Sequence, residues 1–363
     1  MALERLELLS EHGCFGGVQR FYKHFSVNQI GLPMRFALFL PPQTLAGQKV
    51  PLLTYLAGLT CTEETATMKA GAQRMAAQLG LALLFPDTSP RNSGIDGEDH
   101  HWDFGVGAGF YLDATEHPWA GHWQMESYLL QDLIPGVVAE FGLDGDRLGI
   151  TGHSMGGHGS LTLALRHPGV FRSLSAFAPI CAPTKCPWGH KAFLGYLGQD
   201  EATWAAHDAS LLMAGQKSAP YPGGILIDQG LADKFLTEQL YPEAFEAACA
   251  QAGQPLTLRR HAGYDHGYYF ISSFIDDHLR HHAQVLLALP RTLRCHGGLP
   301  IIRRPLFTAR PCAHANSTSS PSTGTVPCST PPPSSRAASR RRWPMWAAPC
   351  PPTRRPATSS AWG

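Results

Sequence analysis

A serine flanked by glycines is the first feature of this chain that could do chemistry. Residues 150–157 read ITGHSMGG, with Ser154 between Gly152 and Gly156. An apolar run precedes the serine and a small-residue segment of helical character follows, a pattern typical of a nucleophile on a sharp strand-to-helix turn. Such a turn strains the serine backbone, and glycines two residues before and after it prevent collisions. The segment therefore predicts a nucleophilic Ser154.

A serine nucleophile needs an imidazole base and a carboxylate that orients the base. Asp233 lies just past the predicted strand 224–228, and His266 precedes the last predicted helix. This chain order, serine then acid then histidine, is the one such a turn requires. Asp228 ends the same strand, where a structural role is the more common one, so Asp233 is preferred as the acid. His153 is expected to pack behind the site, because consecutive residues at the turn point apart.

Two backbone N–H groups are candidates for stabilising a developing oxyanion. A helix beginning behind Ser154 aims the N–H of Met155 at a bound group and favours negative charge there. The loop after the apolar run 50–56 should supply the second donor, the N–H of Leu59. Cys61 then lies close to the pocket, but no partner for a cysteine nucleophile is indicated.

Metal chemistry is not predicted. His278 and His282 stand four residues apart on a predicted helix, as metal ligands can. Without a third ligand at a suitable spacing, a solvated helix face is the preferred interpretation. His158 is interpreted as a packed helix residue.

The elements that must position these residues alternate along the chain. One or two strands are expected within 17–40. Further strands are predicted at 50–56, 81–85, 147–151, 173–178, 224–228 and 255–260, and helices at 65–79, 124–141, 155–166, 201–213, 236–252 and 267–284, with an irregular excursion at 180–200. Alternation of this kind predicts an α/β fold: a mostly parallel central sheet with helices on both faces and the chemistry at the carboxyl ends of its strands.

Composition divides the chain into two parts. Of its 363 residues, 44% are hydrophobic and 16% charged, and no run of eighteen apolar residues predicts a membrane span. Glu4, Glu7 and Glu11 do not fit a signal peptide, and the five cysteines before residue 290 are odd in number and irregularly spaced. A cytoplasmic protein with free thiols is expected.

The C-terminal part has a different composition. Residues 291–363 contain eleven arginines and thirteen of the 30 prolines, without lysine, aspartate or glutamate. We predict a catalytic domain over 1–287 and a disordered, low-complexity extension over 288–363. Such a composition is typical of a GC-rich coding sequence translated out of frame. A basic arm that binds nucleic acid or another polyanion is the alternative, disfavoured by scattered arginines without aromatic interleaving.

Eight blocks of the sequence resemble the S-formylglutathione hydrolase family, also known as esterase D. They are YLAGLTCTEE at 55–64, FPDTSPR at 85–91, GEDHHWDFGVGAGFYLDATEHPW at 97–119, GHSMGGHGS at 152–160, AFAPICAP at 176–183, CPWGHKAFLGYLG at 186–198, DQGLADKFL at 228–236 and YDHGYYFI at 264–271. The resemblance covers nearly all of residues 5–285 and leaves the arginine-rich extension outside. It implies an α/β-hydrolase fold, and its nucleophile, acid and base fall on Ser154, Asp233 and His266.

What the resemblance implies is hydrolysis of the thioester S-formylglutathione to formate and glutathione, in formaldehyde detoxification, through a formyl-enzyme and without a cofactor. A homodimer is also implied. Because formyl is the smallest acyl group, a pocket narrowed by Trp102, Phe104 or Trp188 is expected beside Cys61. A general carboxylesterase acting on small acyl esters is the alternative among enzymes.

Overall fold

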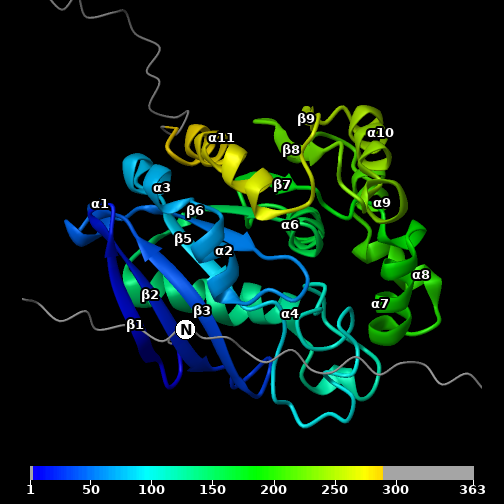
Figure 1. Cartoon of the computed structure of the whole chain (residues 1–363), viewed down its shortest axis with the longest axis horizontal. Coiled ribbons are helices and arrows are strands. Elements are labelled where there is room, and N and C mark those ends of the chain that lie inside the picture. The colour runs from blue at the N-terminus through cyan, green and yellow to red at the C-terminus, as the bar shows by residue number, and fades with distance from the viewer. Residues whose placement is uncertain (1–2, 289–363) are drawn as a thin grey trace, which may run out of the picture. The chain divides into compact units, whose positions relative to one another are not determined.

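A nine-stranded sheet forms the centre of the protein. The computed structural model describes residues 3–288, and its strands are ordered β1-β2-β3-β5-β4-β6-β7-β8-β9 (Figure 1). β1 (Glu7–Cys14), β2 (Gly17–Phe25) and β3 (Pro33–Leu40) pair antiparallel, as do β3 and β5 (Ala82–Pro86). All further pairings, through to β9 (Leu256–His261), are parallel. The predicted α/β fold with a mostly parallel sheet is confirmed.

The continuous apolar runs form strands that are buried along their whole length. Every residue of β4 (Pro51–Leu56), β5, β7 (Ser173–Phe177) and β8 (Ile225–Gly230) is buried. Strands need this composition when both faces of a parallel sheet are covered. β9, at the edge of the sheet, contains both half-buried and exposed residues.

Helices cover both faces of β6 (Asp144–Gly152), the strand that leads to Ser154. A Cβ built on Gly149 would lie 3.1 Å from atoms of both His282 and Leu286 in α11 (Tyr268–Leu286), whereas one on Gly152 would meet Gly156 in α6 (Met155–Arg166). Residues three apart on a strand face opposite sides, so α11 and α6 lie on opposite faces. α3 (Gln73–Leu79) packs beside α11, and α9 (Ala209–Ala214) beside α6 (Figure 1).

Two predicted helices are divided. The predicted helix 65–79 consists of α2 (Glu63–Lys69) and α3, because Gly71 between them adopts φ +75°. The predicted helix 124–141 begins as α4 (Met125–Ser127), continues through a widened turn at Tyr128–Leu133, and ends as α5 (Ile134–Phe141). Pro135 lies in the first turn of α5, so the interruption expected near it is present.

The segment 180–200, predicted to be irregular, contains α7 (Pro187–Leu197). The segment did not predict a helix because it contains glycines, which have a low helix propensity. Two of them are required by packing, since a Cβ on Gly189 would lie 2.1 Å from the Pro183 carbonyl oxygen and one on Gly195 would lie 2.4 Å from the Phe104 ring. β1 was likewise not predicted, because its residues are almost all exposed and show no buried face.

None of the described helices is long and apolar enough to cross a membrane. The predicted extension 288–363 lies outside the described residues, apart from residue 288. The other helices are α1 (Pro42–Leu45), α8 (Glu201–Trp204) and α10 (Pro242–Ala252), with single turns at Trp119–Gly121, Pro183–Lys185, Ala205–His207 and Leu236–Leu240.

Candidate active site

Ser154 occupies the turn between β6 and α6. Its backbone has φ 58° and ψ −118°, a conformation that residues other than glycine rarely adopt. The turn is fixed to the two neighbouring strands, because the N–H of Ser154 donates to the Phe177 carbonyl and that of His153 to the Leu56 carbonyl, both at 3.0 Å. The sheet therefore holds the strained serine in place.

Gly152 and Gly156 leave the space that this turn needs. A Cβ on Gly152 would lie 2.1 Å from the carbonyl oxygen of Gly156, and one on Gly156 would lie 2.1 Å from that of Leu56. Both obstacles are backbone atoms, which no rotamer change can move. The glycine spacing seen in the sequence is thus a steric requirement of the turn.

Asp233 and His266 are joined directly. The Nδ1 of His266 donates to Oδ2 of Asp233 at 2.5 Å, and Asp233 follows β8 while His266 precedes α11. Asp233 also accepts from Gln229 Nε2 at 3.2 Å and from the Phe235 N–H at 2.8 Å. Burial acts to raise the pKa of Asp233, but these hydrogen bonds, led by that of His266, hold it below its ordinary value. The carboxylate is ionised and fixes the proton on Nδ1 of His266.

Ser154 and His266 face one cavity of about 390 Å³. The Ser154 hydroxyl makes no hydrogen bond to any other residue of the described chain. In hydrolases without substrate the serine–histidine contact is often long and tightens when substrate binds. With its proton on Nδ1, His266 has Nε2 available as a base.

His153 packs against His266. Their ring centroids are 4.6 Å apart. Burial and the neighbouring His266 lower the pKa of His153 well below its ordinary value. His153 is therefore a neutral ring that supports His266, consistent with the expected packing role.

The cavity also contains four of the residues predicted to surround the substrate or its oxyanion. These are Leu59, Cys61, Trp102 and Trp188. Trp102 is 69% exposed at the opening. The indole N–H of Trp188 donates to the Asp103 carbonyl at 2.7 Å, and its backbone N–H donates to Gln239 Oε1 at 3.2 Å. Trp188 is therefore held in one orientation.

Phe104 does not line this cavity, unlike the prediction. Its ring stacks on Tyr196 at 4.4 Å and meets Trp119 edge-on at 4.9 Å. The ring thus packs in the aromatic layer behind the wall. Sequence proximity to Trp102 does not decide this, because neighbouring residues in a loop can point to opposite sides.

The two predicted oxyanion donors differ from their neighbours in having no partner. In the loop after β4, Thr60 N–H donates to Gly107 and Cys61 N–H to Gly58, while Leu59 N–H donates to no other described residue. Met155 is the first residue of α6, where an N–H has no intrahelical acceptor. Met155 directly follows Ser154, and Leu59 lines the same cavity as Ser154, so both N–H groups remain candidates for an oxyanion hole.

Cys61 is a half-buried thiol that is not activated as a nucleophile. Burial raises its pKa, and its Sγ lies 3.7 Å from the Tyr268 hydroxyl. A protonated thiol is a poor nucleophile, so the cysteine forms part of the cavity wall.

Other lining residues were not singled out from the sequence. Phe235, Gln239, Leu240 and Ile180 are among them. Phe235 stands two residues after Asp233, and its ring lies 4.9 Å from that of His266. This spacing was the only sequence signal available, because Gln239 and Ile180 reach the cavity through tertiary packing.

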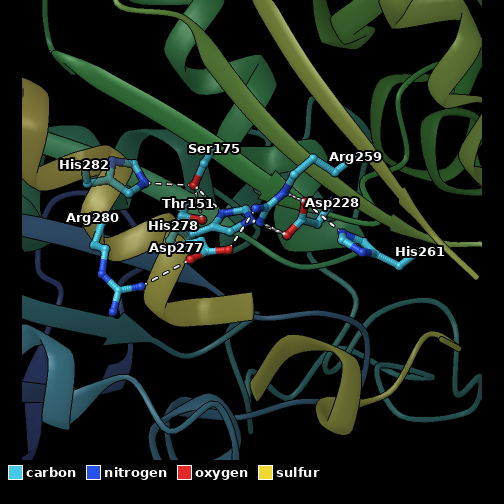
Figure 2. Close-up of polar contacts among 9 residues, drawn as sticks. All are labelled: Thr151, Ser175, Asp228, Arg259, His261, Asp277, His278, Arg280 and His282. Carbon is cyan, nitrogen blue, oxygen red and sulfur yellow. Dashed lines mark hydrogen bonds and ion pairs between the residues drawn. The ribbon is translucent and has the colours of Figure 1, made fainter. Parts of the chain in front are cut away.

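A polar network joins residues of β6, β7, β8, β9 and α11 (Figure 2). Asp228 accepts two hydrogen bonds of 2.6 Å from Arg259 and one of 3.2 Å from His278. Burial alone would raise the pKa of Asp228, but His278 and Arg259 lower it strongly. Asp228 therefore has a structural role, tying β8 to β9 and α11, as expected.

His278 and His282 are fully buried, so the predicted solvated face is wrong. Ser175 Oγ lies 2.8 Å from His278 Nδ1 and 2.8 Å from His282 Nε2 (Figure 2). Their spacing matches that of the buried residues Ile275 and Leu279, a signal the sequence contained. Within residues 3–288 no three His, Cys, Asp or Glu side chains are grouped to hold a metal ion.

Comparisons with known proteins agree on one family. A family model described as a putative esterase matches residues 27–281. An S-formylglutathione hydrolase from Mus musculus is 51% identical over 284 residues, covering 78% of this chain and 99% of the relative. One from Paracoccus denitrificans (strain Pd 1222) is 52% identical over 280 residues, covering 77% and 98%.

A solved structure shows the same agreement. The S-formylglutathione hydrolase from Agrobacterium tumefaciens superimposes with a TM-score of 0.74 at 45% identity, covering 77% of this chain and 99% of that one. The fluorophosphonate-binding serine hydrolase FphF from Staphylococcus aureus superimposes with a TM-score of 0.59 at 19% identity and shares the fold. The three S-formylglutathione hydrolases are thus matched over 98–99% of their own length, and they match 77–78% of this chain.

Proposed function

The chain belongs to the esterase family, and we propose that Ser154, His266 and Asp233 hydrolyse the thioester S-formylglutathione to formate and glutathione. One observation carries this assignment: the strained Ser154 and His266, which is hydrogen-bonded to Asp233, line the same cavity. The identities of about 50% over nearly the full length of the relatives favour S-formylglutathione hydrolase over a general carboxylesterase.

Acylation begins with the serine. Ser154 Oγ attacks the formyl carbon while Nε2 of His266 takes its proton, and Asp233 stabilises the imidazolium that results. The oxyanion formed from the formyl oxygen accepts hydrogen bonds from the N–H groups of Leu59 and Met155. As the tetrahedral intermediate collapses, the carbon–sulfur bond breaks and glutathione leaves with the proton from His266.

Deacylation repeats these steps with water. The same histidine removes a proton from a water molecule, which attacks the formyl ester on Ser154. The second tetrahedral intermediate uses the same oxyanion donors, and its collapse returns the proton to Ser154 and releases formate. These steps use only side chains and backbone groups of the chain itself.

Turnover of S-formylglutathione compared with that of an aryl acetate tests this function. The wild type should prefer the thioester by kcat/KM, and Ser154→Ala should lose both activities. A preference for the aryl acetate would instead identify a general carboxylesterase, and full activity of Ser154→Ala would overturn the mechanism.

We also infer that the protein works in the cytoplasm as a homodimer. The five cysteines of the described chain are all free, which supports a reducing compartment. Light scattering on the purified protein tests the dimer, since a monomer mass at micromolar concentration would contradict it.

A further inference from the structure

The leaving group of the proposed reaction carries charges that the catalytic cavity does not match. At neutral pH the glutathione moiety has two carboxylates and one ammonium, whereas Leu59, Ile180, Trp188, Phe235 and Leu240 give the cavity a largely apolar wall. This wall suits the formyl group and the methylene next to sulfur. The carboxylates must find their partners at the rim.

Lys234 lies beside one residue of the cavity wall, Phe235. Its side chain is exposed, and its Nζ is 4.9 Å from the centroid of the Phe235 ring. That ring lines the cavity and lies 4.9 Å from the ring of His266. The ammonium is therefore within about 10 Å of the catalytic imidazole, held there by attraction to an aromatic face.

Lys69 lies near a second residue of the cavity wall, Cys61. It is the exposed last residue of α2, and its Nζ is 5.9 Å from the centroid of the Tyr268 ring. The hydroxyl of Tyr268 contacts Sγ of Cys61, which lines the cavity. The positive charge of Lys69 is also close enough to Cys61 to act against the effect of burial on the pKa of that thiol.

Both ammonium groups are free of carboxylate partners. Neither Lys69 nor Lys234 forms an ion pair within residues 3–288, whereas Lys191 pairs with Asp103 of the cavity wall at 2.5 Å. The exposed Asp265 beside His266 is engaged by the N–H of Gly267 at 2.9 Å. Within the described residues, both ammonium groups are therefore available to pair with a substrate carboxylate.

We propose that Lys69 and Lys234 bind the two carboxylates of the glutathione moiety and select for this leaving group. The inference rests on the proposed function. The thioester sulfur belongs to the middle residue of glutathione, so at about 3.5 Å per residue the two terminal carboxylates of an extended chain lie about 5 to 7 Å from that residue, on opposite sides of it. A carboxylate at this reach could be met by Lys234, whose Nζ lies within about 10 Å of the His266 ring. Charge complementarity at a rim contributes mainly to recognition and to the rate of encounter.

Steady-state kinetics of Lys69→Gln, Lys234→Gln and the double variant test the proposal, with Lys49→Gln as the matched control. Lys49 is exposed directly before β4, at the end of the strand opposite to the Leu59 loop. Each substitution should raise KM for S-formylglutathione by about 3- to 10-fold with kcat nearly unchanged, and the double variant by more. Lys→Arg at either position should restore most of the affinity, and Lys49→Gln should behave as the wild type.

A second substrate separates this proposal from the function on which it rests. S-formylglutathione with both carboxylates esterified should show the same KM in the wild type and in the double variant. Unchanged KM for S-formylglutathione in the double variant, or an equal loss for both substrates, would overturn the lysine subsite while leaving the proposed function intact. Absence of S-formylglutathione turnover in the wild type would instead overturn the proposed function.

Discussion

Replacing Asp233 by asparagine tests the central contact of the site. Oδ2 of Asp233 accepts hydrogen bonds from His266 Nδ1 and Gln229 Nε2, and Oδ1 accepts from the Phe235 N–H. An asparagine amide must place its NH2 group at one of these two positions. At Oδ1 it opposes the Phe235 N–H. At Oδ2 it opposes Gln229 and donates to His266, which moves the histidine proton to Nε2.

Both orientations of the asparagine amide lower the free energy of unfolding, but only the second one moves the histidine proton and so lowers kcat. A lost or opposed hydrogen bond lowers the free energy of unfolding by about 1 to 3 kcal/mol. A proton on Nε2 prevents His266 from accepting the proton of Ser154, which reduces kcat about 10³- to 10⁴-fold, or about 4 to 5.5 kcal/mol of transition-state stabilisation. We expect the larger effect on kcat, with the variant still folded.

Stopped assays with S-formylglutathione and urea unfolding followed by circular dichroism measure the two quantities. Asp265→Asn is the matched control, because Asp265 adjoins His266 and its Oδ1 accepts only from the Gly267 N–H, which an asparagine oxygen can also accept. We expect its kcat to stay within about two-fold of wild type. A kcat of Asp233→Asn within ten-fold of wild type would refute the assignment of Asp233 as the acid.

Four further predictions follow from other parts of the structure. Trp188→Ala should raise kcat/KM for a 4-nitrophenyl hexanoate relative to the acetate by about 10-fold, since the locked indole is removed from the cavity; an unchanged ratio would exclude Trp188 from acyl selection. Gly156→Ala should abolish activity and lower stability by about 3 kcal/mol or more, measured by urea unfolding, because its Cβ meets a backbone oxygen; wild-type kinetics would contradict the turn geometry. Burial lowers the pKa of His158 to about 3, so between pH 7.5 and 5 the unfolded chain takes up a proton on this residue and the folded chain does not. Lowering the pH over this range should therefore reduce the free energy of unfolding by about 2 kcal/mol. In His158→Leu the reduction should be smaller by that amount, as measured by urea unfolding at both pH values. A chain ending at residue 288 should keep kcat/KM within about two-fold of the full chain, because the relatives are matched over nearly their full length without the remainder; loss of activity would show that residues 289–363 contribute to function.

The order of strands and helices could be predicted because their local patterns are strong. Buried parallel strands need continuous apolar runs, and the runs at β4, β5, β7 and β8 stood out for that reason. Elements whose sequence is decided by a neighbour were missed. The glycines of α7 are required by Pro183 and Phe104, which no local pattern can show, and β1 has no buried face to produce an alternating pattern.

His278 and His282 show how tertiary context reverses an interpretation. Two histidines four residues apart on a helix are polar by type, and the sequence favoured a solvated face. In the structure Ser175 and Asp228 contact three of the four imidazole nitrogens (Figure 2), and Ser173 contacts the fourth, Nδ1 of His282. Burial of a polar ring is acceptable only with such partners, and these come from strands 50 to 109 residues away in the chain.

The sequence by itself determined the strained turn at Ser154, because such a turn tolerates only glycine at positions 152 and 156 and this requirement is visible in five residues. It also predicted that Ser154, Asp233 and His266 lie at the same edge of the sheet, since the carboxyl ends of parallel strands meet there. Only the tertiary structure decided which side chains face the cavity: Trp188 and Phe235 line it and Phe104 does not. The physical reason is that the direction of a loop side chain depends on the packing of distant elements, and one sequence carries no local record of it.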